Sequence, residues 1–214
     1  MLVYGGYDVM AVQDKTHTGV VIVSEAWDGR LAYVISQVGS PPMLTAAAIA
    51  LNGSTLSSPR AWGWAGIHIL LAVLAPLLYL VWLVRRELVT DLDVQLRQQR
   101  IKPMLFTVVC AGLAWLVLVL GAAPQPMVIL AGALWVQAAV TFAITLRWKV
   151  SVHCAAAAGT ATVVWFLMGT ALPLLVGVPL IAWSRVRLRR HTLAQTIAGT
   201  LLGLAVFLPI ARSI

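Results

Sequence analysis

The chain has 214 residues, of which 61% are hydrophobic and only 10% are charged, and its net charge is +8. Soluble domains contain about 45–50% apolar and about 25% charged residues. A chain of this length cannot hide so much apolar surface from water, so the composition excludes an ordinary soluble protein and predicts an all-α integral membrane protein.

The first 30 residues differ from the rest of the chain. They contain six charged residues and no long apolar core, which is unlike a cleaved signal peptide. We therefore predict a short N-terminal extension over residues 1–30 and a single transmembrane domain over residues 31–214.

Six apolar segments follow in chain order, at residues 31–51, 62–84, 104–120, 127–146, 154–183 and 193–210. A membrane-spanning helix needs roughly 20 residues. The first segment contains Pro41 and Pro42, so it spans with a kink or only dips into the membrane. The fifth is too long for one helix and contains Gly169, Pro173 and Pro179, which favours a hairpin of two short helices. The sequence thus predicts a bundle of six to seven transmembrane helices.

The loops between these segments alternate in charge. One set is basic and includes Arg85, Arg86 and Arg147, whereas the loops at 121–126 and 169–173 carry no charge. Positively charged loops stay in the cytoplasm, so we expect a multi-pass protein of the cell membrane whose basic face is cytoplasmic. Because the basic residues lie between apolar segments, we expect no nucleic-acid partner.

Three polar clusters lie on this basic face, at residues 91–103, 149–153 and 184–195. An even number of predicted crossings separates them, so all three can meet in one site. Each cluster ends where an apolar helix begins, and the free N–H groups of a helix N-terminus attract anions. With Arg97, Lys102 and Arg185 added, the pattern predicts a phosphate-binding pocket.

Two histidines complete this predicted site. Phosphoryl transfer needs a nucleophile and a proton donor for the leaving oxygen, and His153 and His191 can fill these roles. Gln195 follows His191 by four residues, so on a helix the two share a face, and the amide oxygen can fix the imidazole tautomer.

The third cluster matches a known family pattern, in which Ser-Arg is followed after five residues by His. Ser184, Arg185 and His191 fit this spacing, and Ser151 and His153 match part of a second motif. Lys102-Pro103 loosely matches a first motif. The sequence therefore resembles the type 2 phosphatidic acid phosphatase superfamily, which shares its core with vanadium haloperoxidases, over roughly residues 91–205.

This resemblance implies a hydrolase that removes phosphate from a lipid phosphate or an isoprenyl (di)phosphate without a metal or other cofactor. His191 would attack phosphorus and become a phosphohistidine, and His153 would protonate the leaving group. Lys102, Ser151 and Arg185 would bind the phosphate oxygens, beside Ser184 of the same motif.

Several positions depart from the family pattern. Gln95 stands where the family has its first Lys, which leaves Arg97 as a substitute, and Val150 and Val152 replace Pro and Gly. Gln195 replaces the closing Asp, which removes the negative charge that would stabilise an imidazolium. An inactive relative that binds or moves anionic lipids is therefore the alternative hypothesis.

A membrane prenyltransferase is a third hypothesis. Such enzymes bind diphosphate through magnesium and paired Asp-rich motifs, but here only Asp91 and Asp93 form a cluster. We interpret these two residues as capping or solvated loop positions.

The remaining polar residues have simpler interpretations. Cys110 and Cys154 lie inside or at the edge of apolar segments and are expected to be packing residues, and His68 is expected to be a polar group whose hydrogen bonds are satisfied. Arg187 and Arg190 are expected to anchor anionic lipid headgroups, and the role of Arg189 stays open.

Overall fold

The computed structural model describes residues 27–94 and 96–214, and its regular secondary structure there is entirely helical. The α-helices are α1 (Trp27–Val38), α2 (Pro41–Ser54), α3 (Pro59–Ile69), α4 (Ala75–Arg85), α5 (Ile101–Leu120), α6 (Gln125–Thr145), α7 (Val152–Met168), α8 (Val178–Arg187) and α9 (Leu193–Phe207). Two π-helical segments, η1 (Leu70–Leu74) and η3 (Pro173–Gly177), and two 3-10 segments, η2 (Arg97–Arg100) and η4 (Leu208–Ser213), adjoin them.

The predicted extension over residues 1–30 falls largely outside the described residues. Helix α1 begins at Trp27, so the last four residues of the predicted extension are already helical.

Within residues 27–94 and 96–214, four helices are long and apolar enough to cross a membrane. They are Pro59–Arg85, Arg97–Leu120, Gln125–Thr145 and Leu193–Ser213, and the bent pair α1–α2 makes a fifth if it counts as one span. The predicted total of six to seven is not confirmed, because α7 has only 17 residues and α8 only 10. The structure therefore supports an all-helical membrane protein with four or five candidate spans.

The predicted kink in the first apolar segment is present. Helices α1 and α2 meet at a bend of 45°, and α2 begins directly at Pro41. Proline has no N–H group to continue the preceding helix, but it fits the first turn of a new one, because those N–H groups have no partner within the helix. The two prolines thus end α1 and begin α2.

The predicted hairpin in the fifth apolar segment is also present, as α7 and then η3 with α8. Gly169 follows α7 with a φ of 71°, the left-handed conformation that glycine adopts without steric cost. Pro173 and Pro179 lie in the first turns of η3 and α8. The glycine reverses the chain and the prolines restart the helix, so the segment forms two short helices.

Helix α7 occupies the centre of the bundle, where it packs against α9, α2 and α8. Its alanines are almost fully buried, and Gly199 and Gly203 of α9 lie directly against it. A Cβ atom at either glycine would collide with a carbonyl oxygen of α7, that of Ser151 or that of Ala155. These small residues therefore allow the two helices to pack closely. Both cysteines are buried free thiols.

The outer surface is strongly apolar. On α5, for example, Leu105, Val109, Leu113 and Leu116 are each at least 44% exposed. Monomeric soluble proteins rarely expose apolar patches of this extent. Lipid is the environment that suits this surface, in agreement with the composition.

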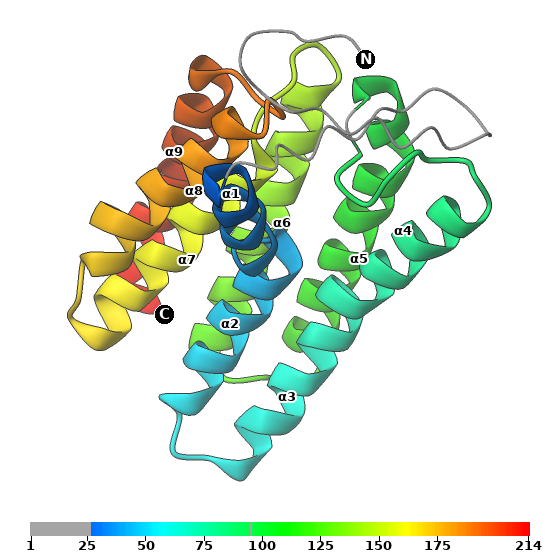
Figure 1. Ribbon diagram of the computed structural model, residues 1–214. Helices are drawn as coiled ribbons and strands as arrows, with labels where there is room; N and C mark the ends of the chain where they lie inside the picture. Colours follow the sequence, from blue (N-terminus) through cyan, green and yellow to red (C-terminus); the bar gives the residue numbers. More distant parts are fainter. Residues whose placement is uncertain (1–26, 95) are drawn as a thin grey trace, which may run out of the picture.

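The connections that bear the predicted polar clusters lie at one end of the bundle (Figure 1). The loop between α4 and α5, the α6–α7 connection and the α8–α9 connection meet there. The turns between α2 and α3, α5 and α6, and α7 and η3 lie at the opposite end. The fold thus gathers the three clusters on one face.

Candidate active site

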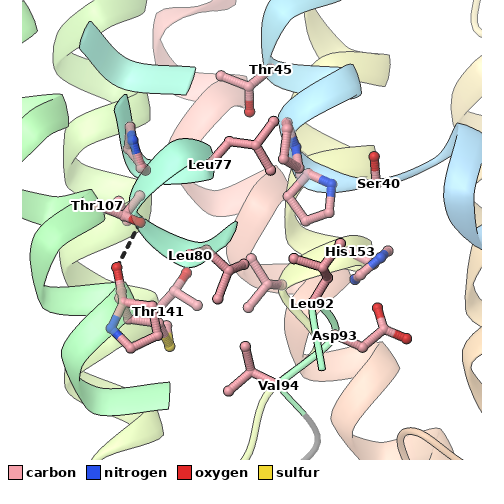
Figure 2. Close-up of a pocket in the computed structure, with 18 of the residues that line it drawn as sticks. Ser40, Thr45, Leu77, Leu80, Leu92, Asp93, Val94, Thr107, Thr141 and His153 are labelled. Atoms are coloured by element: carbon pink, nitrogen blue, oxygen red, sulfur yellow. Dashed lines mark hydrogen bonds between the residues drawn. The ribbon is translucent and has the colours of Figure 1, made fainter. Parts of the chain in front are cut away.

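A cavity of about 580 Å³ opens among α1, α2, α4, α5, α6 and α7. Its polar end is lined by Asp91, Asp93, Arg100, His153, Arg190 and His191. Apolar side chains such as Val73, Leu77, Leu80, Met104 and Leu134 also line the cavity. In Figure 2, His153 and Asp93 lie close together, and Leu77 and Thr45 lie farther from Asp93. The cavity can therefore hold an anionic group and an apolar tail together.

The two predicted catalytic histidines line this same cavity. His153 lies in the first turn of α7, after the N-cap Ser151. His191 lies in the connection before α9, whose N-cap is Thr192. The side chains are 9% and 6% exposed, respectively. Two imidazoles from distant parts of the chain are thus brought to one buried surface, as the predicted convergence of the clusters requires.

Gln195 contacts His191, but not because the two share a helical face. His191 precedes the helix, and the Gln195 side chain turns back in a capping box with Thr192. Its Oε1 accepts the Thr192 N–H (3.3 Å) and lies 3.0 Å from His191 Nδ1. An amide oxygen only accepts, so Nδ1 carries the proton and Nε2 keeps its lone pair. This tautomer leaves the lone pair of Nε2 available to accept a proton or to attack an electrophile.

The surroundings of His191 favour its neutral form. Burial, together with the nearby positive charge of Arg100, lowers the pKa of His191 to about 3, although the hydrogen bond that His191 donates to Gln195 opposes this shift. The charges of Arg185 and Lys149 act in the same direction as Arg100. The imidazole is therefore uncharged at neutral pH, which is the state that a nucleophile needs.

Three arginines surround the polar end of the cavity. Arg100 and Arg190 line it, and Arg185 lies behind Asp93 with only 1% of its side chain exposed. The Nε atoms of Arg185 and Arg190 are buried and make no hydrogen bond. A buried donor without a hydrogen bond is costly, and an anion in the cavity would accept one from Arg190, which lines it. Lys149 adds a further charge and donates from Nζ to the Arg190 carbonyl oxygen (2.8 Å).

Two of the predicted phosphate ligands lie elsewhere. Lys102 is exposed and lines a separate, smaller hollow with Leu83 and Val89. Arg97 is also exposed and donates to the carbonyl oxygens of Thr145 and Leu146 at the end of α6. Neither side chain lines the cavity that holds the histidines.

The two predicted serines have structural partners. Ser151 Oγ accepts the Cys154 N–H and caps α7, and Ser184 Oγ donates to the Ile181 carbonyl oxygen. Both side chains are fully buried beside the site rather than lining the cavity. Of the five predicted phosphate ligands, Arg185 is therefore the one with a direct link to the cavity, through Asp93.

The interpretation of Asp93 as a capping or solvated residue is wrong. Its carboxylate lies 3.4 Å from Arg185 Nη1 and 3.6 Å from Arg190 Nε. Asp91 lines the same cavity. Among the described residues, no group of three or more His, Cys, Asp or Glu side chains is arranged to hold a metal ion.

The interpretation of Arg190 as a lipid anchor is corrected as well, since it lines the cavity. Arg187 instead pairs with Asp28 of α1, at 2.8 Å. Arg189 is exposed with a φ of 54°.

Arg100 is the main residue that the sequence reasoning missed, although the helical period contained a signal for it. Arg100, Pro103, Thr107 and Ala111 are spaced by three or four residues and all line the cavity. Lys102 is two positions from Arg100 and therefore lies on a different face. Arg100 shares its helical face with residues that line the cavity, and Lys102 does not. The helical period therefore favours Arg100 over Lys102 as the phosphate-binding cation.

Comparisons of the chain with protein-family models, with curated proteins and with solved structures found no match. The resemblance to the type 2 phosphatidic acid phosphatases therefore rests on the residues named above, and function has to be argued from the geometry of the site.

Proposed function

We propose that this protein is a membrane-embedded phosphatase that hydrolyses a lipid phosphate or an isoprenyl (di)phosphate through a phosphohistidine intermediate. One observation supports this most directly. Two buried histidines line a single cavity together with Arg100 and Arg190, and the cavity continues into an apolar chamber. The arginines suit a phosphate, the imidazoles suit its transfer, and the chamber suits a hydrocarbon tail.

In the proposed reaction, His191 Nε2 attacks phosphorus and the bond between phosphorus and the alcohol oxygen breaks. His153 gives a proton to the leaving alkoxide, which departs as the lipid alcohol. His153 then takes a proton from water, whose oxygen attacks the phosphohistidine and releases inorganic phosphate. Arg100, Arg190 and Arg185 stabilise the negative charge on the phosphoryl oxygens throughout.

The chamber also indicates how the substrate enters. It is lined on one side by Ser40, Pro41 and Thr45 of the bent pair α1–α2, and on the other by Pro76 and Leu77 of α4. Helices α1 and α4 diverge towards the polar end (Figure 1). We infer that the tail enters sideways from the membrane between them, with the phosphate on the cytoplasmic face that the basic loops define.

The direct test is phosphate release by purified protein in detergent without added metal. The substrates are phosphatidic acid, a polyprenyl phosphate and a polyprenyl diphosphate, with a phosphodiester lipid as the negative control. Release from at least one monoester or diphosphate supports the proposal, and no release from any of them contradicts it.

The chamber predicts a variant that is selective for tail length. Ala138 lines the cavity, so Ala138→Trp would fill the space for the tail. We expect kcat/KM for a long-chain lipid phosphate to fall by at least about tenfold, the cost of roughly 1.4 kcal/mol of lost tail binding. Hydrolysis of p-nitrophenyl phosphate, which has no tail, should change little.

Val140→Trp is the matched control, because Val140 lies on the same helix and is 37% exposed outside the cavity. Equal loss of activity towards both substrates in Ala138→Trp would indicate misfolding and would argue against a tail chamber.

Lys149 gives an expected pH dependence. Burial, followed by repulsion from Arg100, lowers the pKa of Lys149 to about 8. Its positive charge is therefore present below that pH and is lost above it, whereas His191, with a pKa of about 3, stays neutral across the range. We expect kcat/KM, which reports the free enzyme, to fall with pH above about 8.

A Lys149→Arg variant tests this assignment, because a guanidinium keeps its charge over the whole range. The decline of kcat/KM at alkaline pH should move upward or disappear in this variant. If kcat/KM declines at the same alkaline pH in both proteins, the group whose titration causes the decline is not Lys149.

The alternative function, binding of anionic lipids without turnover, is favoured by Gln195. A carboxylate at this position would stabilise a positively charged imidazole, and an amide does so less well. The alternative predicts saturable binding of lipid phosphate with no phosphate release, and a gain of turnover in Gln195→Asp.

A further inference from the structure

Gln137 is a buried polar side chain in the wall of the cavity. It lies in α6, a candidate membrane span, and is only 7% exposed. Its Oε1 atom is buried and accepts no hydrogen bond. Among the described residues of the apolar helices, Asn52 and His68 also bury such atoms, but Gln137 is the one that lines the cavity. Unpartnered polar groups are costly in the membrane interior, where no bulk water can satisfy them, so this amide suits a ligand with a polar group.

Two neighbouring hydroxyl groups of the cavity wall already have partners within the protein. Thr141 Oγ1 donates to the Gln137 carbonyl oxygen (2.6 Å), and Thr107 Oγ1 donates to the Pro103 carbonyl oxygen (2.9 Å). A hydroxyl group has a single hydrogen, so neither threonine has a donor left for a ligand. The side-chain amide of Gln137 differs from both, because it carries two donor hydrogens on Nε2.

The position of the amide is fixed by a glycine of α7. A Cβ atom at Gly159 would lie only 3.0 Å from Gln137 Oε1, so the amide oxygen packs against bare backbone there. With the oxygen covered by α7, Nε2 is the atom of the amide that is left for a ligand. Gly159 follows His153 by six residues on α7, which places it about 9 Å farther along the helix axis. Ala156, between the two, lines the cavity. The cavity therefore offers a hydrogen-bond donor about 9 Å beyond the histidine.

This depth matches the linkage between the phosphate and the tails of an acyl lipid. In a diacylglycerol phosphate, about six bonds separate phosphorus from an acyl carbonyl oxygen, an extended reach of about 7 Å. A phosphoryl group in contact with a catalytic histidine lies about 3 Å from it. The carbonyl oxygen therefore arrives at the level of Gln137. An isoprenyl chain has only carbon and hydrogen atoms at this depth.

We propose that Gln137 is a specificity-determining residue that donates from Nε2 to an acyl carbonyl oxygen, so that the site favours an acyl lipid phosphate over an isoprenyl phosphate. This inference rests on the proposed function. Both lipids place the same phosphate at the arginines and displace the same water from the amide, so these contributions cancel from the preference. The hydrogen bond does not cancel. A carbonyl oxygen accepts it, whereas a hydrocarbon chain leaves the donors buried without a partner.

The experiment compares two lipids that differ only in their carbonyl groups, a diacylglycerol phosphonate and its dialkyl ether counterpart of equal chain length. The carbon–phosphorus bond of a phosphonate is not hydrolysed, so binding to the wild-type full chain in detergent can be measured without turnover. The wild type should bind the diacyl lipid about tenfold more tightly, and Gln137→Leu should abolish this ratio. Any difference in how the lipids partition into detergent is common to both proteins and cancels from the change in the ratio.

Thr141→Val is the matched control, because Thr141 lines the same cavity one turn along α6 and its hydroxyl group is already bonded to the backbone. It should keep the wild-type ratio. Equally weaker binding of both lipids to Gln137→Leu would mean that Gln137 only shapes the cavity, and an unchanged ratio would mean that it contacts no carbonyl group. Either result overturns the inference.

Two wild-type measurements keep the inference separate from the proposed function. If the wild type binds neither phosphonate, or binds the two equally tightly, the inference fails whether or not any variant folds. If the same preparation releases phosphate from a lipid phosphate, the proposed function stands despite that failure. If it releases none but prefers the diacyl phosphonate, and Gln137→Leu removes that preference, the carbonyl contact is supported and the proposed hydrolysis is not.

Discussion

Replacing His191 with alanine is expected to lower phosphate release from a lipid phosphate by at least about a thousandfold, the scale seen when a covalent nucleophile is removed. The physical reason is specific to this side chain. Gln195 holds Nδ1 as the protonated nitrogen, so Nε2 keeps the lone pair that attacks phosphorus. Alanine removes that atom. The rate of phosphate release under saturating substrate is the measurement.

The same variant should lose the covalent intermediate. Wild-type protein mixed with a substrate labelled in the phosphoryl group and quenched at alkaline pH should retain acid-labile label, and His191→Ala should retain none. Lys102→Ala is the control, because it removes a nearby cation that does not line the cavity. We expect its turnover to stay within about threefold of wild type, as for surface changes away from a site. Full turnover in His191→Ala would remove the proposed mechanism.

The helices were predictable because each has a local cause. Long apolar segments specify spans, the Pro41-Pro42 pair specifies the bend, and Gly169 specifies the turn of the hairpin. The number of spans was not predictable in the same way. A short apolar helix such as α7 is buried within the bundle, and composition alone cannot distinguish burial in protein from exposure to lipid.

The site was predictable where a short motif fixes its geometry. His191 directly precedes the capping box that Thr192 and Gln195 form, so its contact with Gln195 depends on only five consecutive residues. The cations of the site were harder to predict, because whether a cation lines the cavity depends on which face of its helix is turned inward. Arg100 and Lys102 are two residues apart, yet one lines the cavity and the other does not.

Asp93 was misassigned for a related reason. Its partners Arg185 and Arg190 are more than ninety residues away in the chain, so nothing local indicates the pairing. A carboxylate in a charged loop is most simply solvated, and only the packing of α8 and the loop against one another makes it part of the pocket.

The role of His153 predicts an effect that depends on the leaving group. An alkoxide leaving from a lipid phosphate is a strong base, so it needs a proton as the bond to phosphorus breaks. Nitrophenolate is a weak base and leaves without one. We therefore expect His153→Asn to lower kcat for a lipid phosphate by about 10²–10⁴-fold and to affect formation of the phosphohistidine from p-nitrophenyl phosphate much less.

This contrast separates a proton donor from a residue that merely supports the fold. His153 packs at the start of α7, where Ser151 caps the helix, so a structural role in the whole site is the competing explanation. A disturbed site would lose the two substrates alike, since both require the same arginines and the same nucleophile. A single-turnover burst of nitrophenolate that survives in His153→Asn, while lipid alcohol release is lost, assigns the proton transfer to His153. Equal loss of both would show that His153 acts on the structure of the pocket and that the leaving oxygen obtains its proton from another group.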